Sequence, residues 1–482
     1  MSYKKLFKLI IIAISLGSFT SCIATKEFQE PEIDAVEHLY PFEQLSLDST
    51  TLANMPWQKL FNDQQLQSLI HEALENNLNL KQAIQQIKIA QANYFQGKMA
   101  FVPNISLNGD VTLNHPSDND IQGKTDVGLA SLYTAAVQAS WELPIWGKLT
   151  SAKRAAYAQL VQTQVARRAV QTELIANVTT AYYQLLALKK KLDIANETLQ
   201  NRMESLQTLK ALKEAGRATG ADVQQSVAIR YAAEVLIPDL KQSIVETENF
   251  ISNLLGRPPG KINTTTLATQ EPISSPKVGV PASLLRNRPD IIRAEYAFRQ
   301  AFHLTNNART YFYPSLTLTA SGGFKSLDLG DLLLPASMFA NIIAGLTQPI
   351  LNNGVNKARL TQAKASQQQA LLQLKQTIIT AGSEVTDALS SYKKAKKKME
   401  LRENQLDALQ RAVNDSEKLL QFGQANYTNV LTARQNLLSA RLEAVNDKLQ
   451  LLKSGVTLYR ALGGGWKGFD KSDSTQVMNA NQ

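Results

Sequence analysis

Cys22, the only cysteine of the sequence, is the residue whose type and surroundings most clearly predict a chemical modification. It follows lysines at positions 4, 5 and 8, an apolar run over residues 9–16 and a short segment made mostly of small residues. This order is typical of an export leader, and the apolar run is too short to cross a bilayer. Because a lone cysteine cannot form an internal disulfide, we expect its thiol to carry a lipid.

The residues around Cys22 resemble a lipobox, in which the leader is cut before the cysteine and the lipidated cysteine becomes the new N-terminus. Phe19 stands where leucine is usual, and Ile23 stands where aspartate would signal retention in the inner membrane of enterobacteria. We therefore predict that residues 1–21 are removed and that Cys22 carries a covalent lipid. Ordinary cleavage that leaves a free thiol is the alternative.

Two turns of similar design hold the other candidate residues. The first is GRATGAD at residues 216–222, and the second is FGQANYTNV at residues 422–430. Glycine can end a helix in the left-handed conformation, and Asp222 can cap the start of the next helix, which is a structural interpretation. The functional hypothesis is that these turns are free tips, where Arg217 and Asp222 bridge neighbouring chains and close an opening.

No other set of residues has the spacing of a catalytic or metal site. The four histidines lie far apart, at positions 38, 71, 115 and 303, whereas a zinc site needs grouped ligands. GxSxG, HExxH and Walker motifs are absent, and the glycines from position 463 lack the preceding strand of a dinucleotide site. The formal charge of +10 is spread along helical segments rather than gathered on one element. We expect no enzyme activity, no metal and no nucleic-acid partner.

The elements that carry the two turns form a tandem duplication. Equivalent residues of the two halves are separated by a constant 207 positions through two long helical segments and the turn between them. An offset held over such a length without insertion indicates duplication. The matched pairs are Gly147 and Gly354, Val178 and Val385, Gly216 and Gly423, Val223 and Val430, and Gly256 and Gly463.

The helical segments are unusually long. Residues 151–215 contain no proline, and at 1.5 Å per residue they predict a helix of roughly 100 Å. Apolar residues recur every seven positions, as in Ile378, Val385, Tyr392 and Met399. Such a repeat predicts packing against neighbouring helices along one side. The polar residues between these positions favour contact with water on the other side.

Four segments of about 10 residues alternate between apolar and polar side chains, which predicts strands with one oily and one wet face. They lie at about 103–114, 130–143, 314–324 and 339–348. Aromatic residues gather near their ends, and the length suits a tilted strand that crosses a bilayer. Four strands cannot close a barrel, and open edges are not tolerated in lipid, so we expect copies of the chain to share one. The count does not choose between 8 strands from two copies and 12 from three. A globular sandwich is the structural alternative.

The predicted organisation follows from these elements. After the signal peptide, residues 22–55 form a lipidated tether and arm, and residues 56–256 form the first repeat. Residues 257–281 form a proline-rich connector, residues 282–463 the second repeat and residues 464–482 a polar tail that we expect to be poorly ordered.

Several motifs, taken together, resemble the TolC-type outer membrane efflux proteins, specifically the lipoprotein branch (NodT-like) that pairs with resistance-nodulation-division pumps. They are the lipobox, the PWxxLFxDxxL-like opening at 56–66, the junctions LPIWGK at 143–148 and QPIxxxG at 348–354, RPDIxxAE at 288–295, and the two tips. The resemblance implies an α+β membrane protein in which tandem helical hairpins form a periplasmic α-barrel. It also implies four transmembrane strands per chain in a trimeric, 12-stranded barrel in the outer membrane of a Gram-negative bacterium.

The same resemblance implies a passive duct that exports small molecules. Its partners would be two further copies, a periplasmic adaptor, an inner-membrane pump and outer membrane lipid. The tips would contact the adaptor and open as an iris, through Gly216, Arg217, Asp222, Gly423, Asn429 and Thr432. Asp222 falls on a tip aspartate of the family. Where relatives often carry two carboxylates after the second tip, this chain has Asn429 and Thr432, so an acidic constriction ring does not carry over.

Two other functions fit the same elements. One is the outlet of a type I protein secretion system, although RPDIxxAE favours the pump branch. The other is a lipid-anchored coiled-coil scaffold with no pore, because long heptad helices alone do not require a channel.

Overall fold

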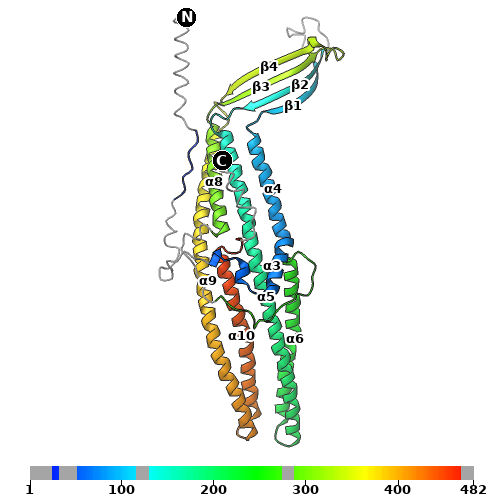
Figure 1. Cartoon of the computed structure of the whole chain (residues 1–482), viewed down its shortest axis with the longest axis vertical. Helices are drawn as coiled ribbons and strands as arrows, with labels where there is room; N and C mark the ends of the chain where they lie inside the picture. Colours follow the sequence, from blue (N-terminus) through cyan, green and yellow to red (C-terminus); the bar gives the residue numbers. More distant parts are fainter. Residues whose placement is uncertain (1–23, 32–51, 115–129, 274–286, 468–482) are drawn as a thin grey trace. The chain divides into compact units, whose positions relative to one another are not determined.

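The computed structural model describes residues 24–31, 52–114, 130–273 and 287–467 (Figure 1). The leader, Cys22 and most of the predicted tether lie outside these ranges, and so do residues 115–129, 274–286 and 468–482. The described chain is α+β, with long helices and one four-stranded sheet. It divides into two compact units. Unit 1 contains residues 24–31, 87–114, 130–163 and 294–374, and unit 2 contains residues 52–86, 164–273, 287–293 and 375–467.

The helices and strands follow the duplicated order expected from the sequence. The first half contains the short elements η4 (Leu52–Asn54) and α2 (Trp57–Leu60), then α3 (Gln64–Asn76), α4 (Leu78–Met99), β1 (Asn104–Asn114), β2 (Ala130–Glu142), α5 (Lys148–Glu214) and α6 (Gly220–Leu254). The second half contains α8 (Pro289–Thr310), β3 (Ser315–Ser326), η6 (Pro335–Ser337), β4 (Met338–Thr347), α9 (Val355–Gln421) and α10 (Tyr427–Ala461).

The element bounds of the described residues locate a length difference between the halves. From α5 and α6 to α9 and α10 every bound shifts by 207 residues, whereas from α4 to α8 both bounds shift by 211. The four-residue change therefore falls within the strand hairpins, and the helices and their turns are the same length in both halves.

The sheet of unit 1 is antiparallel, in the order β1-β2-β3-β4. Its register places apolar residues side by side across all four strands, because directly paired residues share a face. One such row runs Ile105, Ala139, Ala320 and Ile342. The apolar side chains are exposed in the chain, with Ile105 at 69% and Ile342 at 74%. The sheet thus carries a continuous apolar face that no part of the described chain covers.

The opposite face of the sheet is largely polar, although β4 contributes Phe339 and Ile343 to it. The residues that alternate with the apolar row include Asn108, which donates a hydrogen bond to Gln138 on the neighbouring strand at 3.2 Å. Within the described chain, β1 and β4 each pair on one side only. The sheet therefore has two faces of opposite chemistry and two open edges.

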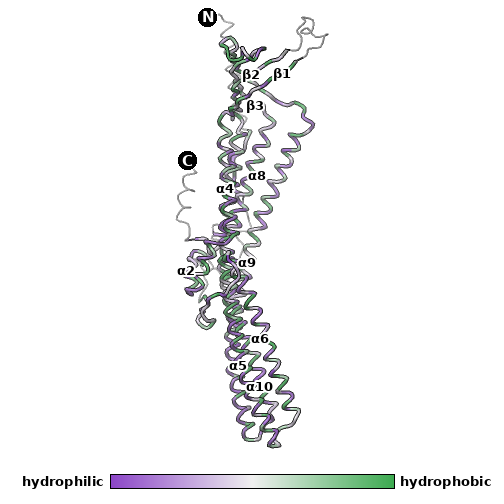
Figure 2. The backbone as a smooth tube through the Cα atoms, turned by 90° about the vertical axis from the view of Figure 1, so that its right-hand side faces the viewer, coloured by the Kyte–Doolittle hydropathy of each residue, from purple (hydrophilic) through white to green (hydrophobic). Residues whose placement is uncertain are grey.

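The helices of unit 2 bury the predicted seven-residue repeat. Val178 and Leu185 on α5 and Ile378 and Val385 on α9 are all almost fully buried. Figure 2 shows apolar and polar residues interspersed along these helices rather than separated into blocks, as expected for helices with one packed side. Figure 1 shows the α5–α6 and α9–α10 turns at the same end of this unit.

Among the described residues, no helix is both long enough and apolar enough to cross a membrane.

The expectation of a poorly ordered tail is wrong for its first residues. Trp466 donates a hydrogen bond to the Asn287 carbonyl at 2.9 Å, and Arg168 lies 4.7 Å from the centre of its ring. Gly463, Gly464 and Gly465 are buried, because glycine lets the backbone pass close to its neighbours. These glycines and the tryptophan are packing residues of unit 2.

Candidate functional site

The first turn is held by backbone bonds at the end of α5. Gly216 has φ 71°, a left-handed conformation that favours glycine. Its N–H donates to the Lys213 carbonyl at 3.0 Å, and the Arg217 N–H donates to the Leu212 carbonyl at 2.8 Å. These two bonds satisfy carbonyls that the helix end would otherwise leave open. Glycine thus sets the reversal of the chain at this tip.

The start of α6 is closed by a reciprocal pair of side chains. The Asp222 N–H donates to the Thr219 hydroxyl at 3.2 Å, and the Asp222 carboxylate accepts from the Thr219 N–H at 2.8 Å. This arrangement is a capping box. The hydrogen bonds from the Thr219 side chain and backbone lower the pKa of Asp222. The structural interpretation of Asp222 as a helix cap is therefore confirmed.

The second turn repeats the backbone of the first without its cap. Gly423 has φ 72°, its N–H donates to Leu420 at 3.1 Å, and the Gln424 N–H donates to Leu419 at 2.8 Å. Each of these residues is 207 positions after its counterpart. The N-cap of α10, Asn426, makes no capping bond with its side chain.

Asn429 and Thr432, the two polar residues predicted after the second turn, form hydrogen bonds at the start of α10. Asn429 bonds through its backbone N–H to the Asn426 carbonyl at 3.0 Å, and the Thr432 hydroxyl donates to the Thr428 carbonyl at 3.0 Å. Neither residue carries a charge. The second turn therefore lacks the carboxylate that Asp222 supplies to the first.

The two tips pack against one another within unit 2. Leu206, Leu209 and Val223 form a buried apolar cluster near the first turn. Tyr427, from the start of α10, packs against this cluster. The structure therefore brings the two predicted tip segments together through apolar contacts.

Arg217 and Asp222 are not bonded to each other in the described chain. Asp222 is engaged by Thr219, while Arg217 is exposed and its side chain forms no hydrogen bond or ion pair with the described residues. A bridge through either side chain requires a second chain, and it stays a prediction.

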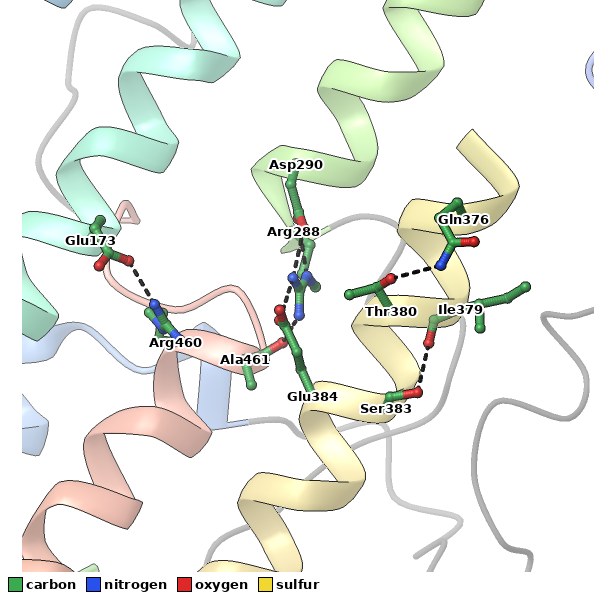
Figure 3. Close-up of polar contacts among 10 residues, drawn as sticks. All are labelled: Glu173, Arg288, Asp290, Gln376, Ile379, Thr380, Ser383, Glu384, Arg460 and Ala461. Atoms are coloured by element: carbon green, nitrogen blue, oxygen red, sulfur yellow. Dashed lines mark hydrogen bonds and ion pairs between the residues drawn. The ribbon is translucent and has the colours of Figure 1, made fainter. Parts of the chain in front are cut away.

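The motif RPDIxxAE (the RPD motif) connects the start of α8 to α9 and α10 through Arg288. Arg288 is buried and donates to the carbonyl of Ala461, the last residue of α10, at 3.0 Å. It also forms ion pairs with Asp290 at 2.6 Å and with Glu384 on α9 at 2.7 Å. Figure 3 shows the guanidinium between these partners. Burial alone would lower the pKa of Arg288, but the two carboxylates outweigh it and raise that pKa.

The opening motif places Asp63 at the centre of a second hydrogen-bond network of unit 2. Its carboxylate caps α3 through the Gln65 and Leu66 N–H groups, and it accepts from Tyr182 at 2.8 Å and from Thr265 and Gln270 of the connector. Burial tends to raise the pKa of Asp63, but these hydrogen bonds lower it overall. The network holds residues 265–270 of the predicted connector against α5.

The junction motif LPIWGK joins strand to helix in unit 1. Trp146 donates to the Pro314 carbonyl at 2.6 Å, and Lys148 pairs with Glu142 at 2.8 Å. The equivalent junction of the second half uses Asn356, which donates to the Tyr311 carbonyl at 2.8 Å. Like the RPD and opening motifs, the junctions have structural contacts that explain their composition.

A polar groove between α5, α9 and α10 was not predicted from the sequence. It encloses about 410 Å³ in unit 2, and its lining includes Arg202, Arg434 and Arg441. These arginines lie on two helices that are more than 200 residues apart in the sequence. Their spacing gives no sequence signal, because only the packing of α5 against α10 brings them together.

Two further predictions concern the lipidated cysteine and the absence of a metal site. Cys22 lies outside the described residues. Across the described ranges, no group of three or more His, Cys, Asp or Glu side chains is arranged to hold a metal ion.

Comparison with known proteins identifies a family over most of the chain. The sequence model described as "Outer membrane efflux protein" matches residues 69–257 and 280–464. Cation efflux system protein CusC of Escherichia coli O6:H1 is 28% identical over 469 residues, which cover 95% of this chain and 99% of CusC. Probable outer membrane lipoprotein SilC of Salmonella typhimurium is 27% identical over 470 residues, which cover 96% of this chain and all of SilC.

A solved structure agrees in fold as well as in sequence. A CusC crystal structure, from a study of folding and transmembrane channel formation, superimposes with a TM-score of 0.82 at 27% identity. The match covers 92% of this chain and 100% of the CusC chain.

Proposed function

The chain belongs to the outer membrane efflux protein family, and we propose that three copies of it form one passive channel for small molecules. Its place is the outer membrane, where it is the channel component of an efflux system. The trimer, the docking partners and the lipid anchor are the specific parts of the proposal.

The observation that carries the proposal is the sheet of unit 1. One face is apolar and exposed over four strands, as lipid requires, and the other is polar, as a water-filled lumen requires. Its strands contain 10 to 13 residues, close to the roughly 9–11 that cross a bilayer at a tilt. A sheet with these faces fits the wall of a membrane channel.

The open edges support assembly. In lipid, unpaired strand edges leave backbone N–H and C=O groups without partners, which is strongly unfavourable. Because β1 and β4 point in opposite directions, β4 of one copy can pair antiparallel with β1 of the next. Three copies then supply 12 strands, and every strand is paired on both sides.

The paired turns support docking by a second protein. Both tips lie at one end of unit 2, and most of their residues, including Arg217 and Gln424, are exposed. We propose that a periplasmic adaptor contacts this end and connects the channel to an inner-membrane pump of the resistance-nodulation-division class. The channel itself performs no reaction. The similarity to a cation efflux protein supports an efflux role. The proposed cargo is small molecules.

The anchor is proposed at Cys22. The lipobox-like leader supports it, and so does the similarity over almost the whole chain to a probable lipoprotein, SilC. Replacement of Cys22 by alanine abolishes incorporation of labelled palmitate. Normal labelling of that variant contradicts lipidation at this residue.

Conductance in planar bilayers tests the channel and its tips together. The double substitution R217A and D222A removes the only charged pair that the first turn offers to a neighbouring chain, so we expect higher passive conductance than in the wild-type protein. Q424A with N429A is the matched control, because these residues occupy the equivalent positions of the uncharged second turn. Equal conductance of the R217A/D222A variant and the wild type contradicts a closing role for the pair.

A further inference from the structure

The polar groove between α5, α9 and α10 is crossed by two arginines of α10. Arg434 binds Glu417 on α9 at 2.6 Å and Ser205 on α5 at 2.5 Å. Seven residues later, Arg441 binds Glu197 on α5 at 3.1 Å and Gln410 on α9 at 3.4 Å. Each arginine therefore links both walls of the groove, and each has its own glutamate.

A third arginine lies between these two links without a carboxylate. Arg202 on α5 is only 3% exposed and lines the groove. Its Nη2 reaches Gln435 at 3.4 Å, and its Nη1 is buried with no hydrogen-bond partner. No described carboxylate forms an ion pair with it, and nearby Glu204 is exposed and accepts from Gln200 instead.

An uncompensated guanidinium in this position is unfavourable. Removing a charge from water is costly unless an opposite charge and good hydrogen bonds replace the water. Burial, and then the positive charge of Arg434, lower the pKa of Arg202, in contrast to the raised pKa of Arg288 beside its two carboxylates. A buried water can satisfy one N–H group but does not balance the charge.

We infer that this groove is an oxyanion-binding site in which a carboxylate or phosphate group pairs with Arg202. The planar guanidinium matches both groups in geometry, because two N–H groups can donate to two oxygens. Amide and hydroxyl side chains of the lining, Asn201, Asn414 and Thr198, can serve the remaining oxygens. The lining also holds three glutamates, but Arg441 and Arg434 already bind Glu197 and Glu417, and Glu204 accepts from Gln200.

The site is built by one chain and does not depend on the proposed trimer. All lining residues belong to unit 2, and Arg202 is buried without any contribution from another copy. The oxyanion has two possible sources, either a free anion such as phosphate or a carboxylate side chain of a docked protein. Both present the same chemistry to Arg202.

Calorimetric titration of the full-length, detergent-purified protein tests the site. Sodium phosphate and sodium glutarate are titrated separately, against sodium chloride of equal ionic strength. We expect saturable binding of at least one of the two anions at one site per chain. Tighter phosphate binding indicates a free anion as the occupant, and tighter glutarate binding indicates a carboxylate side chain.

Substitution R202M separates the site from general surface attraction. It removes the charge-assisted bonds but keeps an apolar stem of similar length, so we expect affinity to fall roughly 10- to 100-fold. R411Q is the control, because Arg411 is an exposed arginine of α9 paired with Asp407, and its loss leaves the affinity unchanged.

Two results overturn the inference. One is the absence of saturable binding of both anions to the wild-type protein, which needs no variant to fold. The other is an equal loss of affinity in R202M and R411Q, which indicates screening of the surface rather than a site.

Discussion

In both repeats, a side chain donates a hydrogen bond to the carbonyl of the last residue of the final helix, but the donor residue differs. In the first repeat, the Asn77 amide donates to the carbonyl of Leu254, the last residue of α6, at 2.8 Å. In the second repeat, Arg288 binds the last carbonyl of α10 in the same way and adds two carboxylates. The positions correspond, since Asn77 and Arg288 differ by 211 residues and Leu254 and Ala461 by 207.

The turns show the same relation. Both are closed by a glycine with left-handed φ and two backbone bonds, but only the first has a side-chain cap, from Thr219 and Asp222. Backbone geometry has thus been retained after duplication, whereas side-chain chemistry differs. Equivalent substitutions in the two repeats therefore distinguish two kinds of contact. Those of the shared backbone frame, meaning the backbone contacts common to both repeats, should give equal losses of stability, whereas side-chain contacts found in one repeat should give unequal losses.

The largest effect is expected at a shared backbone position. A Cβ at Gly256 would lie 2.5 Å from the Asn76 carbonyl oxygen, and one at Gly463 would lie 2.5 Å from that of Asn287. Both glycines also have positive φ. We expect G256A and G463A each to destabilise the protein by on the order of 3 kcal/mol, measured by denaturant unfolding in detergent. A large difference between the two would contradict a shared frame.

The next effect distinguishes the repeats. R288M leaves Asp290 and Glu384 without their cation, and we expect a loss of about 2–3 kcal/mol, below the usual range for a buried pair because both carboxylates are partly exposed. N77A loses two neutral hydrogen bonds, to Leu254 and from Leu80, and should cost about 1–2 kcal/mol. Unfolding midpoints of the two variants in one buffer decide the order. Equal losses would show that the carboxylates add nothing.

Between about pH 4 and pH 6.5, a pH effect on stability is expected from His303 in the second repeat. Burial first, and then Arg154 and Arg299, lower the pKa of His303 to about 4, whereas an exposed histidine titrates near 6.5. The unfolded chain therefore binds more protons between these values, so folding is favoured above pH 6.5 and loses that contribution as the pH falls towards 4. After discounting for partial exposure, we expect roughly 1 kcal/mol.

Thermal unfolding between pH 7.5 and pH 4.5 measures this contribution. H303A is the informative variant, because the position 211 residues earlier holds Ala92. The fall in melting temperature on acidification should be smaller in H303A than in the wild type. An identical pH profile would exclude a neutral, buried His303.

The smallest expected difference concerns the helix caps of the turns. T219A removes the capping box of α6 and should cost about 1 kcal/mol of local stability. N426A changes the equivalent residue of α10, which makes no side-chain capping bond, and should cost close to nothing. Hydrogen exchange of the first turns of α6 and α10 reports the two effects separately. Faster exchange in N426A would reveal a cap that the structure does not contain.

The long helices, the four strands and the turns between helices could be predicted from the sequence. Heptad positions such as Val178 and Val385 marked the buried sides of α5 and α9, and alternation marked the four strands, because both patterns follow from local backbone periodicity. The positive-φ glycines at the turns could be predicted for the same reason. Asp222 was correctly identified as a possible cap, since its partner Thr219 is three residues away.

Contacts between distant segments were not predictable. RPDIxxAE could be recognised as a motif, but nothing in it indicates that Arg288 binds the end of α10. The polar composition of the tail predicts poor order, which is wrong for its first residues because Trp466 packs against Arg168. In the sequence, Arg202 resembles any charged residue on a long helix. Its burial without a carboxylate partner results from the packing of α10 against α5, which the sequence does not reveal.

Native mass spectrometry of the complex extracted from outer membranes tests the central claim most directly. Because the two open edges of a four-stranded sheet must be paired by other copies, the account predicts a particle of three identical chains that stays assembled in detergent. A stable particle of one chain or of two chains contradicts it.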